Sequence, residues 1–334
     1  MDLQEKTKAF GSILLFLALL TRLFVPGTVD AIREYLSIPE HTAFLIYLET
    51  GVDTRSSFSS GQVPAAEAAP AEVAEPATEI PAPAAAAEKA DAESIEIYYG
   101  TKIDADLQAL LDAPLALHPR DGLPSVLIYS THSSESYTPE GESYTPSGDY
   151  RTLDKSFNML SVGKALEESL RRQGITALRD EAIHDSPSYN YAYSHARKSA
   201  AALLNENPTV ELVVDLHRDA VQTKTGQLRP LVPGSEIPTA RIMLVVGTDK
   251  SGLKHDNWEM NLSLALKLHT ILEELCPGIT RPLSIRAQRF NQDLSEGALL
   301  IEIGAAGNSR AEALAATKIL GAAIAELFQR YAAP

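Results

Sequence analysis

The sequence predicts an α/β protein whose core is a mostly parallel, twisted sheet with helices on both faces, preceded by a membrane anchor and a disordered linker. Three observations carry this prediction. Short apolar runs typical of buried strands alternate with longer runs of helical spacing. A strongly apolar segment lies near the amino terminus. Between these two parts is a stretch rich in alanine, proline and glutamate, which has little apolar bulk to bury.

The first 52 residues are expected to contain a short cytoplasmic tip, a signal-anchor helix and a juxtamembrane segment. The helix is the run Phe10–Val25, which is apolar on all faces and interrupted only by Thr21 and Arg22. It is slightly shorter than the ~20 residues of a typical spanning helix, but an arginine near its end can reach the interface. The following Pro26-Gly27-Thr28 does not resemble a cleavage site. An uncleaved single-pass anchor in the cell membrane, with the folded part outside the cytoplasm, is therefore favoured over a removed signal peptide.

Residues 53–92 are expected to form the linker, because scattered prolines prevent a long helix there. The net charge of −15 is concentrated in this region: residues 61–96 contain eight acidic residues and a single lysine. The rest of the chain is only mildly acidic and has no basic patch, so a nucleic-acid partner is excluded. The single cysteine, Cys276, cannot form an intrachain disulfide, and any metal site must use histidine and carboxylate ligands.

Residues 93–334 are long enough to form one folded domain with a substantial core. Apolar runs predict strands, and amphipathic runs predict helices, one of them stopped by Gly174. The expected strands are Ser125–Ser130, Ile175–Leu178, Val210–Leu216, Arg241–Val246 and Ala298–Ile303. The expected helices are Lys155–Gln173, Tyr191–Leu204, Asn257–Leu275 and Ser309–Tyr331.

Chemically active side chains follow these strands or lie close to their ends, where the active sites of parallel sheets collect. Thr131–Tyr137 (THSSESY) follows the first strand, His217-Arg218-Asp219 follows the third, and Glu302 lies near the end of the last. Two histidines and two glutamates are therefore expected at one edge of the sheet.

This set of residues fits a catalytic zinc site, which uses three protein ligands and leaves a fourth position open. We expect His132, Glu135 and His217 to be the ligands. Glu302 then remains as the general base that takes a proton from the attacking water. A glutamate in the apolar strand ALLIEIG is costly to bury without a partner, and a metal site beside it would explain its presence.

Each residue also has an ordinary structural explanation. Glu302 could pair with Arg218, and Glu135 could be the acidic residue at the start of a helix. The pair His184-Asp185 could supply a fourth ligand or support the others. His195 and His269 lie in helical patterns and are expected to be structural. The joint placement of four residues favours the metal hypothesis.

Several segments resemble the stage II sporulation protein P family, in the same order and with similar spacing from Ser125 to the carboxyl terminus. The matching segments are YSTHSSESY at Tyr129–Tyr137, NMLSVG at Asn158–Gly163, DLHRDA at Asp215–Ala220, FNQDLS at Phe290–Ser295 and LLIEIG at Leu299–Gly304, followed by Asn308.

This resemblance implies a zinc-dependent N-acetylmuramoyl-L-alanine amidase, which cuts the amide between muramic acid and the stem peptide of peptidoglycan, with endopeptidase activity in some members. It implies an amidase-like fold for residues 93–334, a role in engulfment during sporulation, and stage II sporulation proteins D and M as partners. His132 and His217 match as zinc ligands and Glu302 as the catalytic glutamate. The family's second histidine is replaced by Ser130, and the helix position of the ligand glutamate in related amidases holds Asp154-Lys155.

Two other hypotheses remain open. Ser133 and Ser134 with the histidines could form a serine hydrolase, although no G-x-S-x-G elbow is present. A non-catalytic wall-binding or regulatory module on a membrane stalk would not need Glu302. A phosphate-binding enzyme is disfavoured by the lack of a glycine-rich fingerprint after the first strand. By location alone, the residues expected to position a substrate are Arg218, Asn291 and Gln292.

Overall fold

The computed structural model describes residues 90–140, 147–224 and 226–332. Contacts divide the chain into two units, Met1–Pro76 and Ala77–Pro334, and all the described residues belong to the second. The expected anchor and nearly all of the expected linker lie outside the described residues. Among those that are described, no helix is both long and apolar enough to cross a bilayer.

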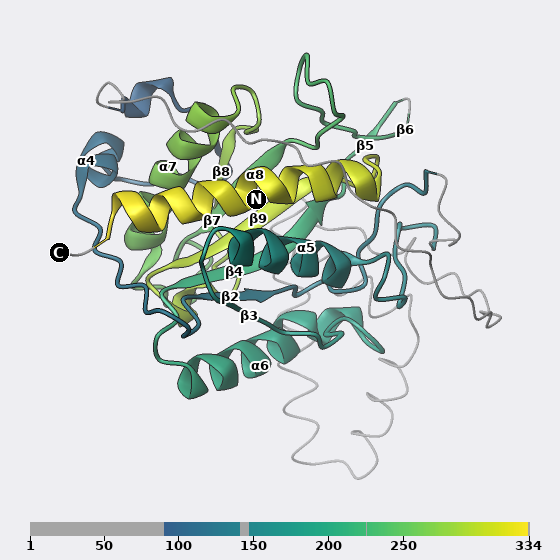
Figure 1. The fold of residues 1–334 in the computed structure, drawn as a ribbon, viewed down its shortest axis with the longest axis horizontal. Helices are drawn as coiled ribbons and strands as arrows, with labels where there is room; N and C mark the ends of the chain where they lie inside the picture. The colour runs from purple at the N-terminus through teal and green to yellow at the C-terminus, as the bar shows by residue number, and fades with distance from the viewer. Residues whose placement is uncertain (1–89, 141–146, 225, 333–334) are drawn as a thin grey trace, which may run out of the picture. The chain divides into compact units, whose positions relative to one another are not determined.

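The core of the second unit is a seven-stranded sheet in the order β1-β8-β7-β9-β4-β2-β3 (Figure 1). Every neighbouring pair in this order is parallel except β7 and β9, which are antiparallel. The predicted mostly parallel sheet is therefore confirmed, with one reversal near its middle. In sheet order, the strands are β1 (Ile97–Tyr99), β8 (Leu283–Arg286), β7 (Ile242–Gly247), β9 (Ala298–Ala305), β4 (Leu212–Asp219), β2 (Val126–Tyr129) and β3 (Ala177–Arg179).

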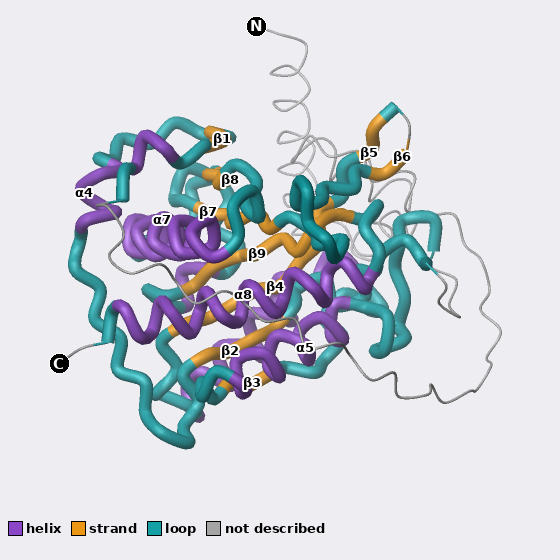
Figure 2. The backbone as a smooth tube through the Cα atoms, turned by 45° about the horizontal axis from the view of Figure 1, so that its top comes forward, coloured by secondary structure: helices purple, strands orange, loops and turns teal. Residues whose placement is uncertain are grey.

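Helices cover the two faces of the sheet unequally, and those over one face stand in front of the sheet in Figure 2. One face packs into the main core together with α4, α5, α7 and α8. The opposite face packs against α6, whose Ala196 and Ala200 belong to the same apolar cluster as Leu127 and Val213. The helices are α4 (Leu107–Asp112), α5 (Met159–Arg172), α6 (Ala192–Glu206), α7 (Trp258–Leu275) and α8 (Arg310–Arg330), with short 3-10 turns at Ala92–Ser94, Tyr189–Tyr191 and Gln292–Leu294.

The cover from α6 stops short of β7. Beyond it, Met243, Val245 and Leu300 form a small separate apolar cluster with Phe290. We call this uncovered part of the second face, on β8, β7, β9 and the end of β4, the open face. Helices therefore lie on both faces as predicted, but only one face is fully covered, which leaves room for a site on the other.

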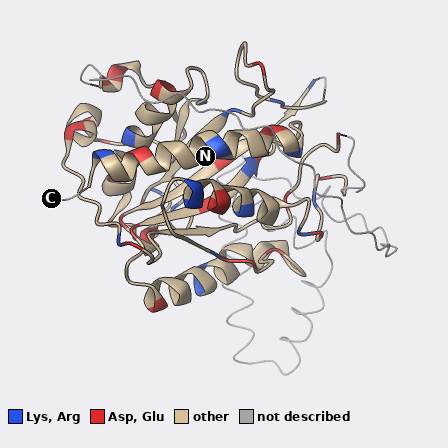
Figure 3. Cartoon of the chain, in the orientation of Figure 1, with Lys and Arg blue, Asp and Glu red and all other residues tan. Residues whose placement is uncertain are grey.

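Local capping explains where the helices begin and end. The side chain of Asn158 accepts a hydrogen bond from the backbone N–H of Leu160, so α5 begins at Met159 rather than at the predicted Lys155. Gly174, at a φ of 81°, follows its end as expected. Ser309 and Glu312 form a capping box that starts α8. Both α5 and α8 carry acidic and basic residues along their length (Figure 3).

The strands differ from the prediction in ways that affect the site. β4 continues to Asp219, so His217 and Arg218 lie within the strand and not after it. The short strands β1 and β8 and a two-stranded hairpin, β5 (Gln222–Thr223) with β6 (Gly226–Gln227), were not expected from the sequence. Strand β8 matters most, because it forms one side of the open face.

Candidate active site

The four residues expected to carry the chemistry line one pocket of about 280 Å³ on the open face. His217 on β4 and Glu302 on β9 are directly opposite each other in the parallel register, and Glu302 is opposite Met243 on β7. Because side chains alternate along a strand, both point to the face that α6 leaves uncovered. The pocket is lined by His132, Glu135, Tyr193, His217, Arg218, Asp219, Ala220, Met243, Val245, Arg286, Gln288, Phe290, Leu300 and Glu302.

The loop that carries His132 is held by two buried aspartates. Asp215 accepts hydrogen bonds from the backbone N–H of Thr131 at 2.8 Å and from its hydroxyl at 2.7 Å. Asp185 accepts from the backbone N–H of Ser134 at 3.1 Å and from its hydroxyl at 2.6 Å. The segment 131–134 is therefore fixed on both sides of His132, which is 8% exposed.

His132 lies among aromatic rings. Its ring stacks on Tyr189 with centroids 4.3 Å apart, and it meets the ring of His217 edge-on at 5.3 Å. Tyr193, on α6, approaches it edge-on at 5.5 Å. This packing fixes the plane of the imidazole and brings both histidines to the same side of the pocket.

Glu135 lies between His217 and two arginines. One carboxylate oxygen is 3.7 Å from Nδ1 of His217, and it accepts a long hydrogen bond of 3.3 Å from the backbone N–H of Arg218. The other oxygen lies 3.8 Å from Arg151 and 3.7 Å from the guanidinium of Arg218. A carboxylate that is only 5% exposed is thereby compensated by positive charge.

Burial and neighbouring charges shift the pKa values in the pocket. Burial lowers the pKa of His132 well below its usual value, so this imidazole is neutral. Burial also lowers the pKa of His217, but the Asp215 carboxylate 3.0 Å from its Nε2 outweighs that effect and raises the pKa to about 9. Burial raises the pKa of Glu302 to about 8. His217 is therefore protonated at neutral pH, and a metal ion would have to displace that proton.

The residue types in the pocket suit zinc, and four buried side-chain atoms there form no hydrogen bond. They are Nδ1 of His132, Oε2 of Glu302, Nε2 of His217 and Nη1 of Arg218, and buried polar atoms without a hydrogen bond call for a structural or functional explanation. Across residues 90–140, 147–224 and 226–332, however, no three His, Cys, Asp or Glu side chains stand close enough together to hold a metal ion. The donor types therefore fit zinc by chemistry and burial, but His132, Glu135 and His217 would have to come closer together to hold an ion.

The three residues expected to position a substrate are used differently. The guanidinium of Arg218 lines the pocket, but it donates to the backbone oxygens of Ser136 at 2.9 Å and Asp149 at 2.8 Å. Gln292 accepts from the N–H of Gly247 and donates to the carbonyl of Val245, both at 2.7 Å. Asn291 donates to the carbonyl of Tyr193 at 2.8 Å. Asn291 and Gln292 do not line the pocket, so their visible contacts hold the backbone around it.

The other predicted alternatives also find structural partners. Nε2 of His184 lies 2.9 Å from Asp180, outside the pocket, and its neighbour Asp185 supports the His132 loop. The hydroxyl of Ser133 donates to the carbonyl of Ser130 at 2.8 Å, and that of Ser134 to Asp185. Neither serine contacts a histidine ring, so the geometry argues against a serine nucleophile.

Sequence reasoning missed four residues that shape the site. Asp215 could have been found, because a residue two positions before His217 in a strand lies on the same face. Tyr189 and Tyr193 depend on how the start of α6 packs, and Arg286 lies on the unexpected strand β8. For these three, no local pattern indicates a place in the pocket.

Comparison with known proteins gives one family and several structural likenesses. The chain is 28% identical over 214 residues to stage II sporulation protein P of Bacillus subtilis (strain 168), which covers 61% of this chain and 51% of that protein. The chain thus spans about half the length of this curated relative.

Among solved structures, the fold is similar to three amidases at low identity. They are N-acetylmuramoyl-L-alanine amidase AmiC2 of Nostoc punctiforme (12% identical, 63% of this chain and 98% of that chain, TM-score 0.37), the CwlD amidase of Clostridioides difficile in complex with the GerS lipoprotein (13%, 62% and 98%, 0.37), and Ami1 of Mycobacterium smegmatis (12%, 65% and 100%, 0.38). Likenesses this distant carry no argument about activity.

The family assignment has a firmer basis. The model of the family described as stage II sporulation protein P matches residues 50–325, which is most of the chain. The match includes all the segments that line the pocket. This chain belongs to the stage II sporulation protein P family.

Proposed function

We propose that this chain is a zinc-dependent peptidoglycan hydrolase that cleaves the amide between N-acetylmuramic acid and the L-alanine of the stem peptide. It acts in wall remodelling during sporulation, tethered to the cell membrane through Phe10–Val25 with the pocket outside the cytoplasm, and stage II sporulation proteins D and M are its proposed partners. The family membership supports the biological setting, and the pocket supports the chemistry.

One observation carries the proposal. His132, His217 and Glu302 come from segments far apart in the sequence, yet they face one pocket in which Nδ1 of His132 and Oε2 of Glu302 are buried and unpaired. Leaving buried polar atoms unpaired costs about 1–3 kcal/mol each. Such a cost is typical of a site that is completed by a ligand.

Each residue of the pocket has a distinct proposed role. His132, Glu135 and His217 would hold zinc, which when bound supplies Lewis-acid polarisation of a carbonyl and lowers the pKa of water. Glu302 takes the proton from the attacking water and passes it to the leaving amine nitrogen. Burial raises the pKa of this carboxyl to about 8, and a cation bound beside it would lower that pKa, so that the ionised carboxylate is present to accept the first proton.

Tyr193 is a candidate for stabilising the oxyanion that develops on the scissile carbonyl. It lines the pocket beside His132, and burial raises the pKa of its phenol well above the usual value. The hydroxyl therefore stays protonated and can donate a hydrogen bond to negative charge. Asp215 and Asp185 contribute by fixing the His132 loop.

The test uses the full chain, purified in detergent, with metal content measured by plasma mass spectrometry. We expect about one zinc per chain and digestion of purified sacculi that releases new amino groups on L-alanine, detected by amino-terminal labelling. A chelator should abolish the release, and added zinc should restore it.

The alternatives give different results in the same experiment. New amino groups on other residues of the peptide would indicate endopeptidase cleavage. Sacculus binding without any new amino group would support a non-catalytic wall-binding module. Full activity after complete removal of metal would refute zinc dependence.

A further inference from the structure

The pocket extends well beyond the proposed reacting groups. It crosses the open face from His217 on β4, past Glu302 on β9 and Val245 on β7, to Arg286 on β8. Between its two ends, the floor is apolar, formed by Met243, Val245, Leu300 and the ring of Phe290. A pocket with a cation at one end and catalytic groups at the other suits an elongated, negatively charged substrate.

Arg286 is held in place but has no anionic partner. Its Nε donates to the hydroxyl of Ser284 at 2.8 Å, and its guanidinium carbon lies 5.0 Å from the ring centre of Tyr98. It forms no ion pair within the part of the chain that the structure describes. The residue is half-buried, so the position of its side chain is restrained. A restrained guanidinium is well suited to bind a carboxylate through two parallel hydrogen bonds.

The other arginines near the pocket are already engaged. Arg218 donates to three backbone oxygens and lies beside Glu135. Arg281 donates to Asp219 at 2.7 Å, and Arg289 lies 3.1 Å from Asp293. Among the described residues that line the pocket, Arg286 is thus the arginine whose charge is left uncompensated.

The sheet geometry sets the distance between this arginine and the proposed base. Strand β7 lies between β8 and β9, so Ser284, to which Arg286 is bonded, is about 10 Å across the sheet from β9. Ser284 is opposite Val245, two residues from the Met243 that faces Glu302, which adds about 7 Å along the strands. The backbone positions of Ser284 and Glu302 are therefore separated by about 12 Å. An extended peptide spans at most ~3.6 Å per residue, so this is the length of about three residues.

We infer that Arg286 forms a subsite for a carboxylate of the stem peptide on its third residue, with the aliphatic parts of the peptide lying over the apolar floor. This inference rests on the proposed function, because it takes Glu302 as the point of cleavage. The carboxylate of the second residue is closer to the scissile amide. It therefore does not reach Arg286 across a separation of about 12 Å, at ~3.6 Å per residue.

The test measures binding of the stem peptide and does not depend on cleavage. The free tripeptide, L-alanine with γ-linked D-glutamate and a diamino acid, is titrated by calorimetry into the full chain in detergent. Three forms are compared: all carboxylates free, the second residue amidated, and the third residue amidated. We expect amidation of the third residue to weaken binding about 10- to 100-fold, the range for a charge-assisted hydrogen-bonded contact, and amidation of the second residue to have little effect.

Substitutions at the arginine separate charge from shape. Arg286→Ala should weaken binding of the free tripeptide by a similar factor and should not weaken binding of the third-residue amide further. Arg286→Lys should retain part of the affinity. Arg289→Ala, paired with Asp293 outside the pocket, is the matched control and should bind like the parent chain. Thermal melting checks that each variant is folded.

Two results would overturn the subsite. The first is that the parent chain binds the free tripeptide and the third-residue amide equally well. The second is that Arg286→Ala weakens binding of both peptides by the same factor. A selective loss on second-residue amidation would also contradict it. A parent chain that binds the tripeptide through Arg286 but never cleaves sacculi would instead refute the proposed hydrolase activity, so the two failures are distinguishable.

Discussion

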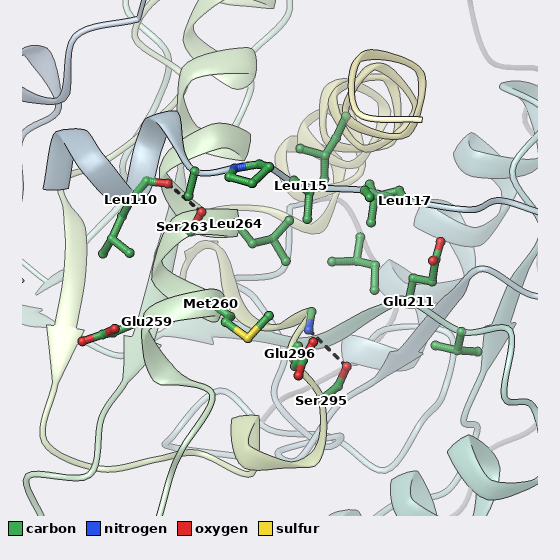
Figure 4. Close-up of a pocket in the computed structure, with 17 residues that line it drawn as sticks. Leu110, Leu115, Leu117, Glu211, Glu259, Met260, Ser263, Leu264, Ser295 and Glu296 are labelled. Atoms are coloured by element: carbon green, nitrogen blue, oxygen red, sulfur yellow. Dashed lines mark hydrogen bonds between the residues drawn. The ribbon is translucent and has the colours of Figure 1, made fainter. Parts of the chain in front are cut away.

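Two cavities lined by described residues differ in character. The larger, of about 640 Å³, lies at the amino ends of β4 and β9 and is lined mainly by apolar side chains such as Leu115, Met260 and Leu264 (Figure 4). The hydroxyl of Ser263 in it donates to the carbonyl of Leu110 at 2.7 Å, and none of the residues that line it has a buried side-chain atom without a hydrogen bond. The smaller, of about 280 Å³, holds His132, His217 and Glu302 with unpaired buried atoms. The unpaired polar chemistry, rather than the volume, distinguishes the candidate active site.

The contrast follows from strand direction. Strands β2, β4 and β9 run parallel, so their carboxyl ends bring the His132 loop, His217 and Glu302 to one region, where active sites of such sheets are found. Their amino ends meet loops and the surface of α7, which offer mostly aliphatic groups. If this assignment is correct, substitutions in the smaller cavity should change activity, and those in the larger one should change mainly stability.

The largest expected effect is on activity, from Glu302→Gln. The amide keeps the shape of the side chain but cannot accept the proton, so sacculus hydrolysis should fall about 10²- to 10⁴-fold with the melting temperature preserved. Glu296→Gln, the same change on the exposed rim of the larger cavity, is the matched control and should leave hydrolysis unaltered. Comparable activity in the two variants would remove Glu302 from the mechanism.

The next effect is on stability, from Leu264→Ala in the larger cavity. Leu264 is 3% exposed and lies in the main core, so its truncation should lower the free energy of unfolding by about 2–5 kcal/mol. Urea unfolding followed by the fluorescence of Trp258 would measure this, with Leu253→Ala, at a side chain that is 54% exposed, as control. Activity per folded molecule should be unchanged at low temperature. A selective loss of turnover would give the larger cavity a functional role.

A third prediction concerns the pH dependence of stability near the same cavity. Burial lowers the pKa of Lys267 to about 8, and its ammonium donates to the carbonyl of Leu110 at 2.9 Å and to Ser263 at 2.8 Å. Below pH 8 the folded state carries the full cost of the buried charge. Between pH 8 and about 10.4, the usual lysine value, the unfolded chain binds more protons, so the stability of the parent chain rises with pH.

Lys267→Met removes this dependence. The free energy of unfolding of the variant minus that of the parent chain should therefore decrease, by at most about 3 kcal/mol, between pH 7 and pH 10.5. Urea unfolding at several pH values measures both free energies. Lys164→Met, at a side chain that is 65% exposed, provides the baseline. If the free energies of unfolding of parent and variant differ by the same amount at every pH in this range, the pKa of Lys267 is not lowered.

Part of the site could be predicted from sequence because it depends on local patterns. Apolar runs located β2, β4 and β9, and the residues next to their ends included His132, Glu135, His217 and Glu302, which the structure places around one pocket. The roles of these residues as ligands and base remain predictions. Their grouping follows from the rule that parallel strands bring their ends together.

The rest depends on contacts between distant parts of the chain. The antiparallel pairing of β7 with β9 leaves no local signature, yet it puts Met243 opposite Glu302 and brings β8 with Arg286 into the pocket. The predicted strand Val210–Leu216 ended too early, because β4 continues to Asp219. The polar residues His217, Arg218 and Asp219 look like a loop in the sequence, although they belong to a strand with one open face. Asn291, in a left-handed conformation, precedes a turn that directs Gln292 at the backbone of β7, which spacing does not reveal.

The smallest expected effect tests the larger cavity directly. Met260 lies at its mouth, 48% exposed, in the first turn of α7. Met260→Glu introduces a charge and a change of shape at the entrance, but it leaves the buried wall intact and suits the positive end of a helix. We expect the free energy of unfolding to change by no more than about 0.5 kcal/mol and sacculus hydrolysis to stay within about twofold of the parent. Because Met260 lines this cavity, a large loss of hydrolysis without a loss of stability would mean that the apolar cavity, and not only the polar one, takes part in the reaction.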